Sequence, residues 1–199
     1  MNNTSQAIIR AVSACAIFFA VVAVCEPVRS RSSAVSVEKV CDGALPEGIG
    51  KVLAARFPDW VIQSSTTLSP SAEQRWTSEK PAACPGIAKG LLESNSTSSV
   101  AVLIVRAVNH DSGAKLLIFQ GANGGYSADF KVLEDTQTGA NNLFIRTVPT
   151  HRFFDKKAVE RFGVRAPEAV LFFDAGKDEY ETDIYFWNGS TFRHEPVDY

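Results

Sequence analysis

The side chains that most often do chemistry in proteins are scattered along this sequence. His110 and Asp111 are adjacent, and an adjacent histidine and carboxylate could transfer protons as an acid–base pair. They stand inside residues 109–113 (NHDSG), however, and that composition is typical of a polar hairpin tip. The other two histidines, His151 and His194, are distant from this pair and from each other, and no HExxH motif is present. We therefore expect no metal ion and no cofactor.

The motifs for nucleophiles and phosphate binding are incomplete as well. Residues 125–129 (GYSAD) place a serine as in GxSxG but end in aspartate, so the nucleophile elbow is absent. Residues 121–125 (GANGG) are rich in glycine, yet the Gly-Lys-Ser/Thr of a phosphate-binding loop does not follow. Scattered carboxylates such as Asp129 and Glu134 leave a hydrolase open, because glycosidases assemble two carboxylates from distant positions.

Charge is divided between two neighbouring segments. The first is basic and contains Arg146, Arg152, Lys156, Lys157, Arg161 and Arg165. The second is acidic and contains Glu168, Asp174, Asp178, Glu179, Glu181 and Asp183. An exposed basic face could bind an anionic surface such as lipid headgroups or a polyanionic glycan, whereas an ordinary solvated surface is the commoner explanation. The acidic segment could hold a cation, but without ligand spacing an acidic hairpin loop is the better interpretation.

The beginning of the chain predicts an exported protein. Arg10 precedes an unbroken run of apolar or small residues from 11 to 24, which ends at Glu26. This pattern is typical of a secretory signal peptide over residues 1–25, whereas a membrane-spanning helix needs about 20 apolar residues. Lipidation at Cys25 is a minor alternative, because bulky Val24 stands where such sites have a small residue. Residues 26–36 then predict a flexible tether, and residues 37–199 a single domain.

Two cysteines follow the predicted signal peptide, Cys41 and Cys84. In an oxidising compartment a lone pair favours one disulfide, and no close CxxC or Cys/His set favours a metal site instead. Cysteine catalysis is disfavoured for the same reason. A formal net charge of −2 argues against a dedicated nucleic-acid binder, so we expect a protein or envelope partner, with the membrane reached only through the signal segment or a lipid on Cys25.

The elements that must position these residues are mostly strands. Helices are predicted over residues 45–57 and 155–162 with a helical turn over 72–76, and strands over residues 60–68, 100–108, 115–120, 126–134, 142–148, 169–173, 181–187 and 191–194. Asp155 can cap the second helix, Ser71 can cap the helical turn, and Asn188-Gly189 is a strong hairpin signal. These elements predict an α+β fold: an antiparallel sheet with an N-terminal helix, one or two short helices and one disulfide.

Four short segments carry a family resemblance. Residues 57–60 (FPDW), 84–90 (CPGIAKG), 100–105 (VAVLIV) and 184–189 (IYFWNG), taken together, resemble a group of small secreted bacterial proteins of uncharacterised function. The resemblance covers most of the chain after residue 25. It implies secretion and supplies no activity or site residues to carry over.

The segment over residues 84–90, with the hydrophobic strand after it, is also distantly similar to FG-GAP-type propeller repeats. Those repeats carry a calcium loop rich in alternating aspartates. This chain has residues 93–99 (ESNSTSS) there, so the calcium argument does not apply.

The sequence therefore favours a secreted or periplasmic, non-enzymatic binding or interaction module at the cell envelope. The alternative is a hydrolase that acts on an envelope polymer through paired carboxylates. Tyr185, Phe186 and Trp187 occupy adjacent strand positions and must point to both faces, so at least one of them is a candidate for a contact surface.

Overall fold

The computed structural model describes residues 41–198 except 42, 80–82, 123–124 and 177–180. The chain divides into two units, residues 1–33 and 34–199, and every described residue belongs to the second. The predicted signal peptide over residues 1–25, Cys25 and the tether over residues 26–36 lie outside the described residues. In the part that is described, no helix is long and apolar enough to cross a membrane.

The first half of the unit forms a sheet of five antiparallel strands, sheet A. Its strands are β1 (Trp60–Ile62), β2 (Ile87–Gly90), β3 (Ser99–Arg106), β4 (Ala114–Ala122) and β5 (Gly125–Thr136). The order is β1-β3-β4-β5, and β1 and β2 follow one another along the same side of β3, opposite β4. Strand β1 pairs with residues 104–106 of β3, and β2 pairs with residues 99–102.

The second half forms a meander of four antiparallel strands, sheet B. Its strands are β6 (Leu143–Pro149), β7 (Glu168–Asp174), β8 (Glu181–Trp187) and β9 (Phe192–Val197). The hairpin predicted at Asn188-Gly189 joins β8 to β9, but four residues, 188–191, separate the strands where a two-residue turn was expected; a 3.1 Å bond from Asn188 N to Thr191 O closes it. Gly189 has a φ of 98°, a value that favours glycine.

The described residues also form three α-helices and two short 3-10 helices. They are α2 (Glu47–Arg56), α3 (Pro70–Glu79), η1 (Ala140–Asn142), η2 (Thr150–Arg152) and α4 (Lys156–Phe162). Helix α4 has the predicted ends, because Asp155 accepts a bond from Ala158 N and Gly163 follows in the left-handed conformation. Helix α3 is longer than predicted, and Ser69 caps it by accepting from Ala72 N at 3.3 Å, where Ser71 was expected.

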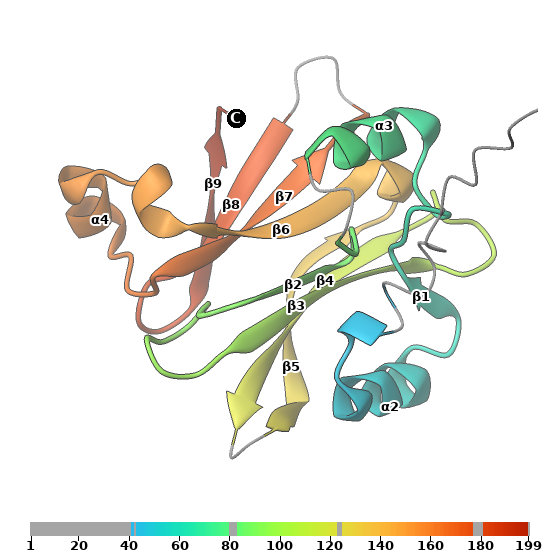
Figure 1. Ribbon diagram of the computed structural model, residues 1–199, viewed down its shortest axis with the longest axis horizontal. Coiled ribbons are helices and arrows are strands. Elements are labelled where there is room, and N and C mark those ends of the chain that lie inside the picture. The colour runs from blue at the N-terminus through green and yellow to red at the C-terminus, as the bar shows by residue number, and fades with distance from the viewer. Residues whose placement is uncertain (1–40, 42, 80–82, 123–124, 177–180, 199) are drawn as a thin grey trace, which may run out of the picture. The chain divides into compact units, whose positions relative to one another are not determined.

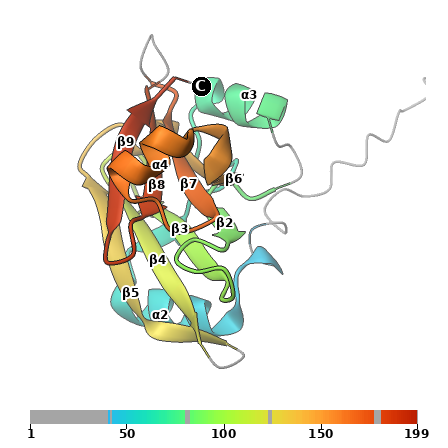
Figure 2. The same ribbon diagram turned by 90° about the vertical axis from the view of Figure 1, so that its left-hand side faces the viewer.

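The elements of this unit stack in four layers (Figure 1; Figure 2 shows the stack from the side). Alternate residues of β3 point to opposite faces of sheet A. Leu103 packs with Ile145 and Phe172 of sheet B, whereas Val102 packs with Ile49 and other side chains around α2. The far face of sheet B is covered by side chains from α3, α4 and the residues around them. The order is therefore α2, sheet A, sheet B, and then α3 with α4.

Strand β6 and the residues around β1 and β2 join the two sheets along one side. Ile145 N donates to Pro85 O at 2.9 Å, and Thr147 Oγ1 donates to Lys89 O at 2.9 Å. Gln63, which is fully buried just after β1, donates from Nε2 to Ala140 O at 3.1 Å and to Leu143 O at 2.7 Å. Buried amides need such partners, so this link fixes where sheet B sits on sheet A.

The predicted fold class is right in its main features and wrong in detail. The fold is mostly antiparallel sheet, and Cys41 and Cys84 form a disulfide, so the predicted pairing is confirmed. The prediction of one sheet is wrong, because the strands divide between two. Strand β2 was not predicted, and the strand expected over residues 60–68 ends at Ile62, where hydroxyl side chains begin to bond to nearby backbone.

Candidate functional site

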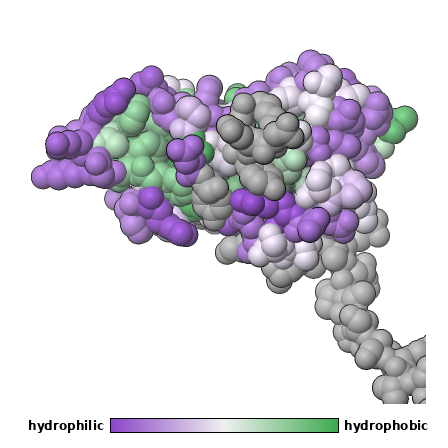
Figure 3. All heavy atoms as spheres, turned by 90° about the horizontal axis from the view of Figure 1, so that it is seen from above, coloured by the Kyte–Doolittle hydropathy of each residue, from purple (hydrophilic) through white to green (hydrophobic). Residues whose placement is uncertain are grey.

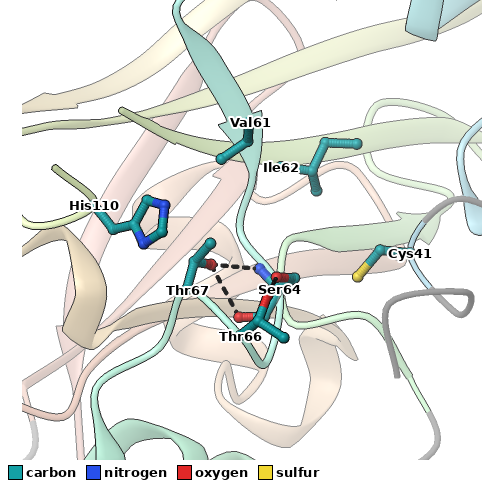
Figure 4. Close-up of a pocket in the computed structure, with 7 residues that line it drawn as sticks. All are labelled: Cys41, Val61, Ile62, Ser64, Thr66, Thr67 and His110. Atoms are coloured by element: carbon teal, nitrogen blue, oxygen red, sulfur yellow. Dashed lines mark hydrogen bonds between the residues drawn. The ribbon is translucent and has the colours of Figure 1, made fainter. Parts of the chain in front are cut away.

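A groove of about 450 Å³ lies beside β1 and is called the β1 groove below (Figure 4). It is lined by Cys41, Val61, Ile62, Ser64, Thr66, Thr67 and His110. Figure 4 shows the valine and isoleucine of β1 along one side, the hydroxyl residues along another, and Cys41 and His110 at opposite ends. The disulfide to Cys84 holds the Cys41 end of this groove to the loop before β2.

The hydroxyl wall of the β1 groove is ordered by its own hydrogen bonds. Thr67 Oγ1 accepts from Ser64 N at 2.8 Å and donates to Gln63 Oε1 at 2.6 Å. Ser64 Oγ lies 2.9 Å from Thr66 Oγ1. Gln63 is the same residue that links β1 to sheet B, so the wall is tied to the core of the unit.

The described residues of the β1 groove do not form a nucleophile–base pair. A hydroxyl nucleophile needs a base within hydrogen-bond reach. Within the described ranges no hydrogen bond joins His110 to Ser64, Thr66 or Thr67. The opposite wall is apolar, and Val61 keeps 39% of its surface exposed. An exposed apolar wall facing ordered hydroxyls is typical of a recognition surface.

A second cavity of about 190 Å³ lies between the sheets, called the intersheet cavity below. It is lined by Glu134, Thr136, Thr138, Leu143, Phe172, Asp174, Asp183, Tyr185 and His194. Tyr185 Oη donates to Glu134 Oε2 at 2.7 Å, which joins β8 to β5. Burial raises the pKa of the Tyr185 phenol, and the hydrogen bond and negative charge of Glu134, with the charge of Asp183, raise it further.

The intersheet cavity brings together carboxylates that are far apart in the sequence. Glu134 lines it with Asp174 and Asp183, whereas Asp129 is exposed elsewhere on β5. Among the residues that the structure describes, no group of three or more histidine, cysteine or acidic side chains could hold a metal ion. Of the acidic segment, Asp178 and Glu179 lie outside the described residues, as does the side chain of Glu181.

The predicted basic patch is divided by the structure. Arg146 is half-buried, with Nη1 2.6 Å from Glu79 Oε2 and its guanidinium 5.3 Å from the Phe173 ring centroid. Burial lowers the pKa of Arg146, the Glu79 carboxylate opposes that shift, and Arg152 and Arg75 add to it. The exposed members are Arg152, Lys156, Lys157, Arg161 and Arg165, on and around α4. Figure 3 shows hydrophilic residues at the end where α4 lies, beside an apolar patch.

The histidines and the aromatic triplet occupy separate places. His110 lines the β1 groove, His194 lines the intersheet cavity and His151 is exposed on η2. Tyr185 and Phe186 are buried on opposite faces of sheet B. Trp187 is half-buried and lines a third groove, of about 310 Å³.

Sequence reasoning missed most lining residues of these cavities. The run Gln63 to Thr67 (QSSTT) was assigned to a strand, although four successive hydroxyl residues are a signal for local side-chain-to-backbone bonds. Thr136 and Thr138 meet Asp174 only through the packing of two sheets, for which no local signal exists.

The comparisons with known proteins add nothing to this geometry. A scan against protein-family models, a search of curated proteins and a search of solved structures each found no match.

Proposed function

We propose that this chain is a secreted or periplasmic, non-enzymatic binding module, and that it engages a protein of the cell envelope through the β1 groove. One observation carries the proposal: the β1 groove joins an exposed apolar wall to hydroxyls that bond to one another. Such a surface offers area to bury and polar groups to orient a partner.

The proposed location is supported by the sequence and by the cysteine pair. The apolar run over residues 11–24 has the length and flanks of a secretory signal. The sulfur atoms of Cys41 and Cys84 lie at bonding distance, and disulfides persist in oxidising compartments such as the periplasm or the exterior.

The proposed contact is supported by two exposed valines. Val61 lies in the groove wall at 39% exposure, and Val108 is 99% exposed in the turn that also holds His110. Burying a fully exposed valine contributes about 1.5 kcal/mol. Because Val61 has only its exposed 39% left to bury, the two valines together are worth about 2 kcal/mol, or roughly thirtyfold in affinity.

Affinity capture from a detergent extract of envelopes tests the proposal, with the purified protein as bait. We expect Val61→Asp and Val108→Asp to lose a specific partner, because a charge would be buried at the contact. Val132→Asp is the matched control, since Val132 is 51% exposed on β5 and does not line the groove. A partner that all three variants retain, or no partner above background, would contradict the proposal.

A hydrolase acting on an envelope polymer is the second candidate. The intersheet cavity favours it, because Glu134, Asp174 and Asp183 line one space and paired carboxylates cleave glycosidic bonds. Release of reducing ends from envelope glycans measures this activity. Glu134→Gln should abolish it, while Asp129→Asn, outside the cavity, should not. Absence of turnover by the unmodified protein would remove this candidate.

A further inference from the structure

A groove beside Trp187, the last residue of β8, has the chemistry of a sugar site. It is called the Trp187 groove below, has a volume of about 310 Å³, and is lined by Glu93, Ser94, Thr97, Ser99, Gln120, Gly121 and Trp187. That volume is at the lower limit of small-molecule sites, which hold roughly 300–1,000 Å³. Seven residues from β3, β4, β8 and the loop before β3 therefore converge on a space of ligand size.

The indole of Trp187 is held in place before any ligand arrives. Lys131 Nζ lies 4.3 Å from the ring centroid, and the Phe192 ring lies 5.2 Å from it at an interplanar angle of 59°. Trp187 comes from sheet B, whereas Lys131 comes from β5 of sheet A. Because the Trp187 side chain is already fixed, little conformational entropy is lost when a ligand binds to it. Its ring offers that ligand an apolar surface.

The polar side of the groove is fixed in the same way. Glu93 Oε1 accepts from Lys131 Nζ at 2.8 Å, and Glu93 Oε2 accepts from the side-chain amide of Gln120. The Glu93 side chain is only 10% exposed, so these bonds determine its orientation. A carboxylate accepts about four hydrogen bonds, which leaves capacity for ligand hydroxyls beside the amide of Gln120.

The loop that closes the groove has no room to move inward. Ser94 Oγ accepts from Thr97 N at 3.0 Å. A Cβ added at Gly121 would lie 2.2 Å from Ser98 O and 2.8 Å from Thr97 Cγ2, so the loop lies directly against β4. The groove is therefore preformed.

The charges of the groove select the class of ligand. Glu93 and Lys131 compensate each other, so neither an anion nor a cation finds an uncompensated charge among the described lining residues. A fixed indole next to a carboxylate, an amide and hydroxyls matches a molecule with an apolar C–H face and hydroxyls at its rim. We propose that the Trp187 groove binds one ring of a neutral saccharide. The ring's C–H face rests on the indole, and its hydroxyls donate to Glu93 and bond to Gln120.

This site is independent of the proposed function. The Trp187 groove includes Ser99, the first residue of β3, whereas the β1 groove adjoins the other end of that strand and shares no lining residue with it. Failure of one proposal therefore leaves the other standing.

Isothermal titration of the full chain with maltose, cellobiose and N,N′-diacetylchitobiose tests the proposal, with sialyllactose as the charged comparison. We expect at least one neutral sugar to bind, Gln120→Ala to weaken it about tenfold, and Trp187→Phe to weaken it further. Gln137→Ala is the matched control, because Gln137 is also exposed and also donates to a carboxylate, that of Asp135.

Three outcomes would overturn the proposal. The first is no binding of any neutral sugar into the millimolar range, and the second is preference for the sialylated sugar. The third is binding that Gln120→Ala and Gln137→Ala weaken equally. Thermal denaturation of each variant separates loss of binding from loss of folding, and Gln120 is exposed, so its variant should fold.

Discussion

Adding one methyl group at Gly86 tests how closely the residue before β2 lies against the residue after β1, Gln63. A Cβ there would lie 2.4 Å from Gln63 O, 2.9 Å from Gln63 N and 2.9 Å from Ile62 Cγ2. Two of these three atoms are backbone, which cannot rotate away. The same backbone is already bonded, because Gln63 N donates to Leu103 O at 2.9 Å and Leu103 N donates to Gly86 O at 2.8 Å. The Gly86→Ala variant must therefore separate β1, β2 and β3.

The expected loss of stability comes from steric overlap and from the hydrogen bond that this overlap breaks. The φ of Gly86 lies outside the left-handed region, so alanine adds no backbone strain of that kind. Forcing a methyl into a packed site costs about 1–3 kcal/mol, and a lost hydrogen bond adds roughly 1 kcal/mol. Since the displaced atoms are backbone, we expect a loss of about 3 kcal/mol. In a unit of this size that lowers Tm by roughly 6–12 °C.

Urea and thermal denaturation, followed by circular dichroism, measure this loss. Gly48→Ala is the matched control, because nothing lies within 4 Å of a Cβ at Gly48 and the residue is in helix α2. Alanine there should stabilise the fold by up to about 0.5–1 kcal/mol. If the free energy of unfolding of Gly86→Ala lay within about 0.5 kcal/mol of that of the unmodified protein, the close contact between Gly86 and Gln63 would be refuted.

Three further predictions concern groups that join the elements. Gln63→Leu leaves the buried carbonyls of Ala140 and Leu143 without their donor and should cost about 2–5 kcal/mol by urea denaturation; a cost below about 1 kcal/mol would contradict the link. Replacing both cysteines with serine should lower the free energy of unfolding by about 4 kcal/mol, because the disulfide closes a loop of 44 residues, from a sequence separation of 43. In the unmodified protein, intact mass with and without reductant should show two protected thiols. Because the pKa of Tyr185 is raised in the fold, its contribution to stability is present below the unfolded pKa of about 10 and is lost as pH rises above it. The free energy of unfolding of Tyr185→Phe should therefore fall less steeply above about pH 10 than that of the unmodified protein. The same pH dependence in both proteins would contradict this role of Tyr185.

The elements that could be predicted are those whose signals are local. Helix α4 was anticipated at both ends because Asp155 and Gly163 are a capping residue and a left-handed glycine. The β8–β9 turn was anticipated from Asn188-Gly189 for the same kind of reason. The apolar residues on both faces of β3 are likewise a local signal, typical of a strand covered on both sides, and both of its faces are buried in the structure.

The features that could not be predicted depend on distant partners. Strand β2 spans four residues with a glycine at its end, and it exists because β3 and β6 offer it partners. The division into two sheets depends on which strands pair, and alternation in one strand does not encode this. Gln63 is an ordinary polar residue in the sequence, and its part in joining the sheets depends on residues 77 and 80 positions away.

The two sheets are built from separate, consecutive stretches of chain, residues 60–136 and 143–197. A chain that emerges from a ribosome or a translocation pore N-terminus first can therefore complete sheet A before sheet B has emerged. At that moment Leu103, Leu116 and Ile118 have no opposing layer, because their partners in the shared core come from sheet B. Until Leu143 and the strands after it arrive, the half-emerged protein is an apolar sheet open on one face, and intermediates of that kind are prone to aggregate.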